Sequence, residues 1–237
     1  PGSTFKVISS FAPAIDLYGA TLASTYYDSE YTVGKKTFKN WYSGGYLGYQ
    51  SIRDGIVYSL NIVAVRCLME TVKPERGYQY AESLGITSLV KDDVNAALAL
   101  GGLTRGVSNL ELTQAYGVIA NSGKMQKAKF FSKIVDQNGK ILIDTTEDEP
   151  TQVMKESTAY LLTDAMRESM ESKRAFASDV RVGSTSTRAH FDGMSLAGKS
   201  GTTSNNRDIW FIGFTPYYVG GIWAGCDDNQ VLKDSNS

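Results

Sequence analysis

Cysteine and histidine are nearly absent from this chain of 237 residues. It contains two cysteines, Cys67 and Cys226, and one histidine, His190. Two distant cysteines in no metal-like spacing indicate neither a disulfide framework nor a zinc site, and we expect both to be buried as small apolar residues. His190 lies in the polar stretch TSTRAHFDG and is expected at the surface, so a serine–histidine–acid triad is not indicated. The sequence predicts no metal and no cofactor.

The chain also lacks a strong net charge and a long apolar run. Its formal charge of −1 gives no long-range field, which argues against a nucleic-acid or anionic-membrane partner and favours a small or peptide ligand. No apolar run approaches the ~18–20 residues that a membrane span needs. The first residue is proline, not methionine, so the missing signal sequence says nothing about a parent protein. We expect the chain to be excised from a longer one.

The first third of the chain is predicted to be mainly helical. Apolar spacing predicts a helix over residues 4–18, with Pro13 as a kink or an early stop. Two helical runs over residues 51–72 meet at the sequence YSLN, and a short helix follows over residues 74–84. Residues 26–49 are rich in aromatic residues and glycine without a clean period, which predicts a long loop.

Local signals are clearest in the middle of the chain. Ser108 and Glu111 form a capping box that begins a helix. The Asn-Gly pair at 138–139, between two alternating runs, predicts a β-hairpin, and residues 155–172 predict an amphipathic helix. The apolar face of the capped helix comprises Leu112, Ala115, Tyr116 and Ile119.

The last part of the chain is predicted to form strands. SLAGKSGTT, DIWFIGFTP and YYVGGIWAG are short aromatic or β-branched runs between polar turns, which indicates three adjacent antiparallel strands. Helices followed by strands predict an α/β fold of the α+β type, in which helices pack on an antiparallel sheet.

Near the start of the chain, Ser3 and Lys6 form an S-x-x-K pattern. Residues three apart share a helix face, so the lysine amine can lie beside the serine hydroxyl as the base of a nucleophile. A lysine with a pKa near 10.4 is a poor base at neutral pH, and burial with a second nearby cation would lower that pKa. The pattern therefore predicts another lysine close by. Alone it is weak, because Ser88 and Lys91 show the same spacing.

Two further patterns add to it. Ser59 and Asn61 in YSLN place a hydroxyl that can relay a proton beside an amide that can hold a peptide bond. In GKSGTT, Lys199 lies on an exposed predicted strand, where it supplies the second cation, and Gly201 would let a ligand approach the backbone. A second S-x-N pattern at residues 204–206 lies in a polar loop and is taken as a solvated turn.

With these patterns in order, the chain resembles the penicillin-binding proteins and serine β-lactamases, whose signature is S-x-x-K, S-x-N and K-[ST]-G. Here they read STFK, SLN and KSG. PGSTFK, ALALGGLTRGVSNLELTQAYGVIANSG and DIWFIGFTPYYVGGIWAG are similar to the transpeptidase domain of class A, bifunctional penicillin-binding proteins. The resemblance covers nearly the whole chain, so residues 1–237 are expected to be one such domain.

The resemblance implies a role for each motif residue. Ser3 would be the acylated nucleophile, Lys6 its general base, and Ser59 the relay that returns a proton to the leaving amine. Asn61 would hold the amide of the donor peptide, and Lys199 would tune the charge of the site. The residues implied to bind substrate on the strand are Ser200, Gly201, Thr202 and Thr203, of which the two threonines would bind the terminal carboxylate. The backbone N–H groups of Ser3 and Thr202 would form the oxyanion hole.

The resemblance also implies partners and location. The donor would be a peptidoglycan stem peptide ending in D-Ala-D-Ala, and β-lactams would acylate the same serine. Members of this family carry further strands before the serine helix, a closing C-terminal helix, a glycosyltransferase domain and a membrane anchor, none of which we expect here. The parent protein would act at the extracytoplasmic face of the bacterial membrane, and the small sheet would keep an unpaired edge.

Alternative functions remain open from sequence. A β-lactamase needs a base for deacylation, and KDDVNAALALGG stands where class A β-lactamases carry E-x-x-L-N, which argues against that class. A D,D-carboxypeptidase shares all the motifs, and a β-lactam-binding domain without turnover is the non-enzymatic alternative. The segment 26–49 could line an acceptor cleft or only cover the helices, and the covering role is favoured.

Overall fold

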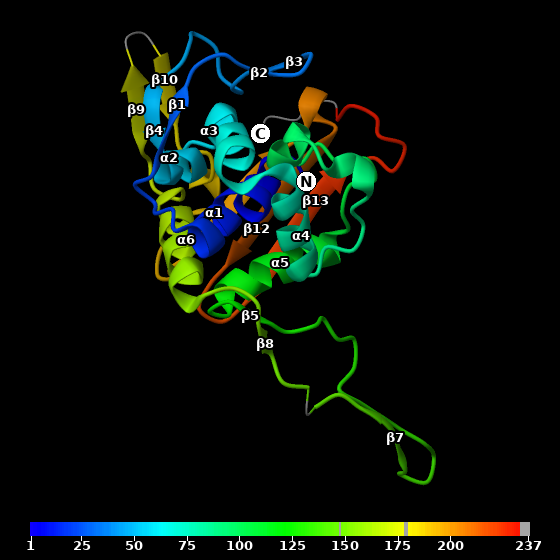
Figure 1. Ribbon diagram of the computed structural model, residues 1–237. Coiled ribbons are helices and arrows are strands. Elements are labelled where there is room, and N and C mark those ends of the chain that lie inside the picture. Colours follow the sequence, from blue (N-terminus) through cyan, green and yellow to red (C-terminus); the bar gives the residue numbers. More distant parts are fainter. Residues whose placement is uncertain (147, 178–179, 233–237) are drawn as a thin grey trace.

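A three-stranded antiparallel sheet forms one layer of the molecule. The computed structural model describes residues 1–146, 148–177 and 180–232 (Figure 1). The sheet has the order β11-β12-β13, all antiparallel, as predicted. Its strands are β11 (Ala197–Thr202), β12 (Asp208–Phe214) and β13 (Val219–Gly225). In the described part of the chain β13 pairs only with β12, and its Ile222 is 68% exposed, so the predicted unpaired edge is confirmed.

Helices pack against this sheet and around the N-terminal segment, which confirms the mixed α/β class. Two helices lie against the strands: α5 (Asn109–Ala120) against β12 and β13, and α6 (Glu156–Glu168) against β11. The helices within residues 1–83 are η1 (Gly2–Thr4), η2 (Val7–Phe11), α1 (Ala12–Tyr18), α2 (Ile52–Val57), α3 (Asn61–Arg66), η3 (Cys67–Val72) and α4 (Pro74–Ser83). Within the described ranges, none is long and apolar enough to cross a bilayer.

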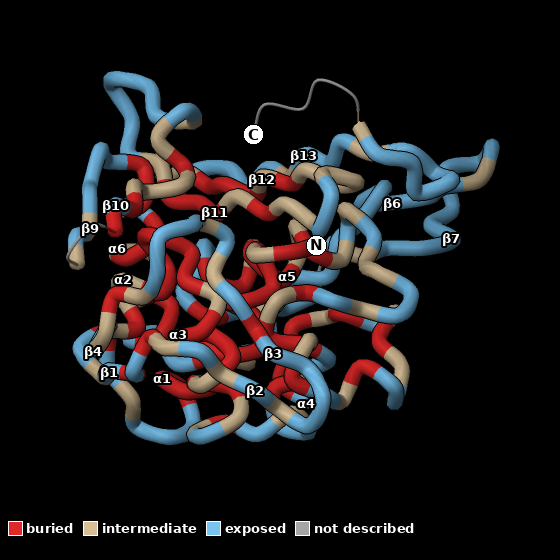
Figure 2. The backbone as a smooth tube through the Cα atoms, turned by 90° about the horizontal axis from the view of Figure 1, so that it is seen from above, coloured by how far each residue is buried: buried red, intermediate tan, exposed pale blue. Residues whose placement is uncertain are grey.

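The N-terminal helix is the centre of the hydrophobic core. Phe5, Ile8 and Phe11 are fully buried, and Figure 2 shows the buried residues gathered in the interior while the strands β6 (Lys133–Val135) and β7 (Ile141–Asp144) are exposed. The helix does not stop at Pro13. Residues 7–11 are π-helical, and the helical backbone continues through Pro13 into α1, so the early stop is wrong.

The predicted local elements in the middle of the chain are confirmed. Ser108 caps α5 through the capping box with Glu111, and all four residues of the predicted apolar face are buried. The Asn-Gly hairpin joins β6 (Lys133–Val135) to β7 (Ile141–Asp144) at the end of an arm that extends from the body (Figure 1). The short pair β5 (Lys124–Met125) and β8 (Thr151–Gln152) forms the base of that arm.

The segment 26–49 was predicted as a loop, and this is wrong in part. It contains two antiparallel pairs, β1 with β4 and β2 with β3. Their strands have three or four residues, too short for an alternating pattern to stand out between glycines. The strands are β1 (Thr25–Asp28), β2 (Tyr31–Val33), β3 (Lys36–Phe38) and β4 (Gly48–Ser51).

Further short elements were not predicted. β9 (Arg174–Ala177) and β10 (Val180–Gly183) form another antiparallel pair. The remaining one-turn helices are η4 (Lys91–Asp93), η5 (Ala96–Leu100), η6 (Thr187–Ala189) and η7 (Ser204–Asn206).

The rare residues of the chain follow the predictions except at one position. Cys67 is buried and His190 is exposed, as expected. Cys226 is exposed, which corrects the expectation that both cysteines are buried. It comes directly after β13, the outer strand, where no described element covers the chain.

Candidate active site

Three glycines let the turn that carries Ser3 pack tightly against its neighbours. Gly2 has φ +57°, and a Cβ on it would lie 2.7 Å from the carbonyl oxygen of Thr202. A Cβ on Gly101, with φ +68°, would lie 2.4 Å from the carbonyl oxygen of Gly2, and one on Gly201 would lie 2.4 Å from that of Pro1. Glycine at 201 therefore makes room for the serine turn, and the expectation that it also lets a ligand approach the backbone stays a prediction.

Substitution of Gly101 tests this packing. We expect Gly101→Ala to lower the free energy of unfolding by roughly 2–5 kcal/mol, since a left-handed alanine costs about 1–2 kcal/mol and forced overpacking about 1–3. Gly19→Ala is the matched control, because Gly19 has φ +70° with nothing within 4 Å. Urea denaturation of both variants would measure the difference, and equal losses would show that close packing at Gly101 is unimportant.

Buried hydrogen bonds fix the same turn. The Thr4 hydroxyl donates to the carbonyl of Pro1 (2.8 Å), and the Tyr116 hydroxyl donates to the carbonyl of Thr4 (2.7 Å). Tyr116 is fully buried, and burial raises the pKa of its hydroxyl well above the usual value, so it stays a protonated donor. Ser3, between these anchors, lines the cleft and is partly exposed.

Lys6 lies one turn further into the core, with its amine held by the YSLN turn. Its side chain is fully buried. Nζ donates to the carbonyl oxygen of Ser59 (2.5 Å), to Ser59 Oγ (3.1 Å) and to Asn61 Oδ1 (2.6 Å). The S-x-x-K and S-x-N motifs, separated by more than fifty residues, are thus joined through one ammonium group.

Lys199 approaches the same hydroxyl from the sheet. Its Nζ donates to Ser59 Oγ (3.0 Å) and to the carbonyl of Ser200 (3.0 Å), and its side chain is fully buried. The predicted second cation beside Lys6 is confirmed. The expectation of an exposed strand is wrong at this position, because the Lys199 side chain points toward the helices and not to solvent.

The pKa of both lysines is shifted downward, in each case mainly by burial. Burial lowers the pKa of Lys6 well below its usual value, and the charge of Lys199 lowers it further. Burial alone lowers the pKa of Lys199 to about 7. A lysine with a lowered pKa is partly neutral near pH 7, and a neutral amine can accept a proton from a serine hydroxyl.

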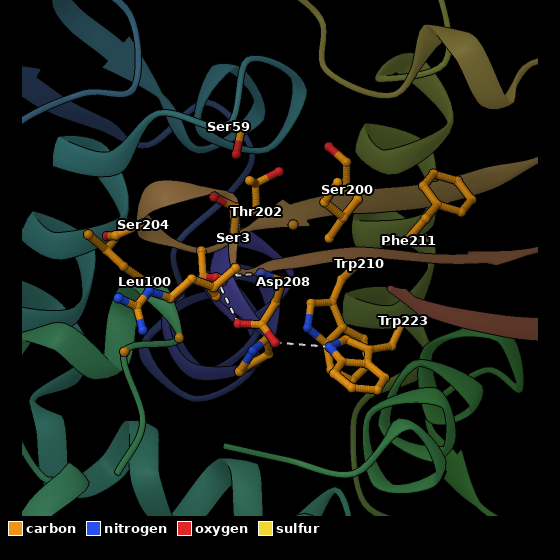
Figure 3. Close-up of a pocket in the computed structure, with 18 of the residues that line it drawn as sticks. Ser3, Ser59, Leu100, Ser200, Thr202, Ser204, Asp208, Trp210, Phe211 and Trp223 are labelled. Atoms are coloured by element: carbon orange, nitrogen blue, oxygen red, sulfur yellow. Dashed lines mark hydrogen bonds between the residues drawn. The ribbon is translucent and has the colours of Figure 1, made fainter. Parts of the chain in front are cut away.

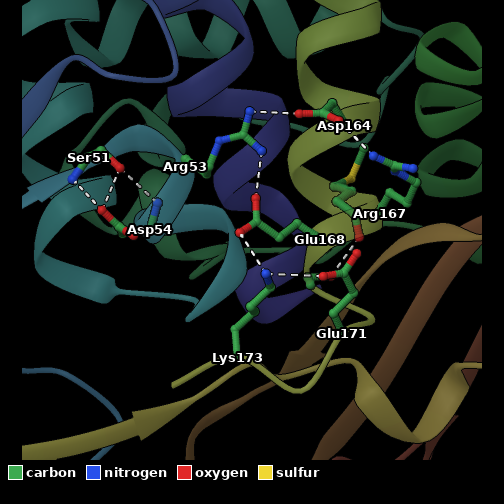
Figure 4. A network of polar contacts seen from close by, with 10 residues as sticks. Ser51, Arg53, Asp54, Asp164, Arg167, Glu168, Glu171 and Lys173 are labelled. Carbon is green, nitrogen blue, oxygen red and sulfur yellow. Dashed lines mark hydrogen bonds and ion pairs between the residues drawn. The ribbon is translucent and has the colours of Figure 1, made fainter. Parts of the chain in front are cut away.

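Ser59 connects the two lysines from a strained backbone position. Its φ is +55°, in the left-handed region that residues other than glycine rarely adopt. The turn is supported from α2, whose capping box joins Ser51 and Asp54. Arg53 in α2 also pairs with Asp164 (2.7 Å) and Glu168 (2.6 Å) of α6 (Figure 4). Such strain persists where the surrounding structure holds it, and it is commonest at functional sites.

A cleft of about 1690 Å³ opens beside these residues (Figure 3). Ser3, Ser59 and Thr202 lie together in it, and Trp210, Trp223 and Asp208 form its other side. The cleft therefore brings two serine hydroxyls and groups of strand β11 into one space, an arrangement that acyl transfer through a serine could use.

The family model described as the penicillin binding protein transpeptidase domain matches residues 1–220. The chain belongs to this family. It is 32% identical to Penicillin-binding protein 1A of Clostridium botulinum over 245 residues, 98% of this chain and 28% of that protein. It is 34% identical to Penicillin-binding protein 1F of Bacillus subtilis over 246 residues, 100% of this chain and 32% of that protein. The predicted resemblance to class A penicillin-binding proteins is confirmed.

A solved structure of this family has the same fold. The PonA1 protein from Mycobacterium tuberculosis in complex with penicillin V aligns with a TM-score of 0.80 at 25% identity, covering 98% of this chain and 61% of that chain. The chain therefore spans roughly three tenths of the two curated relatives named above and three fifths of this solved chain.

The strand hydroxyls of this transpeptidase-family chain are not equally available to a ligand. Ser200 Oγ donates to the carbonyl of Thr185 (3.1 Å), and Thr203 Oγ1 donates to Asp208 Oδ2 (2.8 Å). Trp223 Nε1 donates to the other oxygen of that carboxylate (2.9 Å; Figure 3). Thr202 lines the cleft and is partly exposed. Of the two threonines implied in carboxylate binding, Thr202 is the one free of this Asp208 network.

The two decoy patterns lie apart from the site chemistry. Lys91 is exposed, and Ser88 Oγ donates to the carbonyl of Gly106 (3.0 Å). The second S-x-N pattern forms η7 at the rim of the cleft, where Ser204 is exposed.

Sequence reasoning missed Thr185, Asp208, Trp210 and Trp223 as residues of the site. Asp208, Trp210 and Trp223 lie in the predicted strands DIWFIGFTP and YYVGGIWAG, but no motif marks them as cleft residues. Thr185 accepts a hydroxyl bond from Ser200 through its backbone, which no side-chain pattern reveals.

Proposed function

We propose that the chain forms the catalytic part of a serine D,D-transpeptidase domain that cross-links peptidoglycan stem peptides. The observation that carries the proposal is the pair of buried lysines on Ser59 Oγ, at 3.1 and 3.0 Å, beside a cleft that Ser3 lines. Because both amines bond to the same hydroxyl, the positive charge of Lys199 lowers the pKa of Lys6. A neutral Lys6 amine could then take the hydroxyl proton of Ser3. Membership of the transpeptidase family supports the same reaction class.

The proposed first half-reaction acylates Ser3. Lys6, as the neutral amine, takes the hydroxyl proton while Ser3 Oγ attacks the carbonyl of the D-Ala-D-Ala bond. The oxyanion that forms is held by the backbone N–H groups of Ser3 and Thr202. Ser59 gives its hydroxyl proton to the departing amine and takes the proton held by Lys6, so that D-alanine leaves, Lys6 is neutral again and an ester on Ser3 remains.

The proposed second half-reaction forms the cross-link. An amine of a neighbouring stem peptide attacks the ester carbonyl, Lys6 takes the amine proton directly or through Ser59, and this proton is returned to Ser3 Oγ as the ester C–O bond breaks. Asn61 holds the donor amide, Lys199 tunes the charge of the site, and Ser200, Gly201, Thr202 and Thr203 form the strand against which the donor lies. A β-lactam would enter as a donor mimic and leave a long-lived ester.

The charges of the cleft support a transpeptidase over a β-lactamase. Asp208 is the only acidic residue among the described residues that line the cleft, and its two oxygens accept bonds from Thr203 and Trp223. Asp93, in the segment where a class A β-lactamase would carry its base, is buried and accepts from Thr104 N and Oγ1 (both 2.7 Å). Neither carboxylate is free to activate water on the ester.

In the parent protein, this domain would act at the extracytoplasmic face of a bacterial membrane, held there by an anchor outside this sequence. The relatives are longer than the chain, so other activities of the whole protein would reside in those further parts.

Intact-mass measurement after incubation with a penicillin tests the proposal. We expect one adduct per chain that persists for hours, and trypsin should release it on the peptide of residues 1–6, which contains Ser3. The heat-denatured chain is the control. No adduct on the folded chain would refute the acyl-enzyme, and rapid loss of the adduct would indicate a β-lactamase.

A second assay distinguishes a transpeptidase from a carboxypeptidase by the acceptor that each one uses. With a D-Ala-D-Ala peptide and an amine acceptor, a transpeptidase gives the amide-linked product, whereas release of D-alanine with only the hydrolysed peptide would identify a carboxypeptidase.

A further inference from the structure

The helix that begins with Asn61 lacks a cap of its own. The residue in the capping position of α3 is Leu60, whose side chain makes no capping bond. A leucine cannot accept from the first backbone N–H groups of a helix, and those groups need a partner when they are partly buried. This matters here because the same turn carries Ser59 and Asn61, which bind Lys6.

Asn40 supplies that cap from a distant part of the chain. Its Oδ1 accepts from the backbone N–H of Asn61 (2.9 Å) and of Ile62 (3.2 Å). Its neighbour Lys39 accepts at its carbonyl from Asn61 Nδ2 (2.8 Å). The Asn61 amide thus donates to Lys39 and presents Oδ1 to Lys6 (2.6 Å), so its orientation is defined by a partner on each side.

A buried carboxylate orients Asn40 in turn. Asp28 is 1% exposed, and its Oδ1 accepts from Asn40 Nδ2 (2.7 Å). Its Oδ2 accepts from the Tyr42 hydroxyl and from the backbone N–H of Leu47, both at 2.9 Å. Burial and Asp28 raise the pKa of Tyr42, so this hydroxyl remains a donor. With donors facing Asp28, the oxygen of Asn40 must face the helix.

We propose that Asn40, oriented by Asp28, is a positioning residue that holds Ser59 and Asn61 against Lys6. It touches no substrate and acts through the turn. The left-handed φ of +55° at Ser59 needs outside support, and the bonds from residues 39–41 supply it, including Trp41 Nε1 to the carbonyl of Tyr58 (3.0 Å). The segment 26–49, for which a covering role was favoured, thereby has a part in ordering the catalytic groups.

The inference rests on the proposed function and is tested by acylation kinetics. We expect Asn40→Ala to lower the second-order rate of penicillin acylation by roughly 10- to 100-fold, the scale of a small misplacement of catalytic groups. Asp16→Ala is the matched control. Asp16 is likewise a buried remote cap, since its Oδ1 accepts from the backbone N–H of Lys155 at the start of α6 (2.9 Å). This variant should lose stability but keep its acylation rate when fully folded.

A charge swap provides the rescue. Asn40→Asp alone places two carboxylates together and should acylate as slowly as Asn40→Ala or more slowly. The double variant Asp28→Asn with Asn40→Asp restores one amide and one carboxylate, with the acceptor still facing Asn61 and Ile62. We expect it to recover at least tenfold over Asn40→Asp. A double variant no faster than Asn40→Asp would overturn the orienting role of Asp28.

A measurement without substrate separates this inference from the proposed function. In Asn40→Ala, the backbone N–H groups of Asn61 and Ile62 should exchange with solvent at least tenfold faster than in the wild type. A wild type that is acylated beside an Asn40→Ala variant with normal rate and normal exchange would refute the inference alone. A wild type that is not acylated would refute the proposed function, while the exchange rates would still decide whether Asn40 holds the turn.

Discussion

Replacing Lys6 with methionine is expected to slow acylation of Ser3 by roughly 10²–10⁴-fold, the contribution of a general base. Methionine keeps the length and apolar stem of lysine but cannot accept a proton. The YSLN turn also loses three bonds, because the carbonyl of Ser59, its Oγ and Asn61 Oδ1 all accept from Nζ of Lys6. Stopped-flow measurement with a fluorescent penicillin would give the rate.

The chain contains a matched control for this variant. Lys91 follows Ser88 at the same S-x-x-K spacing but is exposed, so Lys91→Met should leave the rate within twofold of the wild type. Melting temperatures would verify that both variants are folded. A folded Lys6→Met chain that is acylated within tenfold of the wild-type rate would eliminate Lys6 as the base.

The sequence predicts the elements whose signals are local. The capping box of Ser108 and Glu111, the Asn-Gly hairpin and the three C-terminal strands depend on neighbouring residues, and each is confirmed. The motif residues Lys6, Ser59, Asn61 and Lys199 were also found to meet, although they lie on three elements. The contact between these distant residues could be predicted because the motifs occur in the order known for a family. The spacing of residues within one motif does not predict it.

The sequence does not predict contacts between distant residues that follow no motif. Asn40 caps α3 from 21 residues away, and Asp16 accepts from the backbone of Lys155 139 residues away. In both cases the local capping residue, Leu60 or Lys155, makes no side-chain cap, so the sequence shows only a helix that starts without one. The partner becomes visible only when the fold brings it there.

Gly201 and Lys199 show a second kind of contact that the sequence does not predict. The strand pattern places both on β11 but does not say which neighbour fills the space beside each residue. Lys199 is fully buried, and Gly201 lies against Pro1 and Thr4. Both facts follow from the packing of the serine turn onto the inner face of the sheet, which alternation along one strand cannot specify.

Replacing Lys199 with methionine should shift the pH dependence of acylation upward. The charge of Lys199 lowers the pKa of Lys6, so its removal raises that pKa and leaves less neutral Lys6 at pH 7. We expect the midpoint of the rate profile to rise, with acylation at pH 7 reduced about 10- to 100-fold. Part of the loss should be recovered toward pH 9. Rates measured from pH 5 to 10 would give the midpoint.

Lys199→Arg distinguishes charge from shape, since it keeps a cation at this position and should keep the midpoint near that of the wild type. An unchanged midpoint in folded Lys199→Met would show that Lys199 does not tune Lys6.

Loss of stability is not the expected cause of slow acylation in the methionine variant. A buried lysine whose pKa falls from 10.5 to about 7 destabilises the folded chain fully below pH 7, and this cost disappears as the pH rises toward 10.5. Unfolding free energies should therefore rise with pH over that window in the wild type and rise less in Lys199→Met, because the variant has no charge to bury.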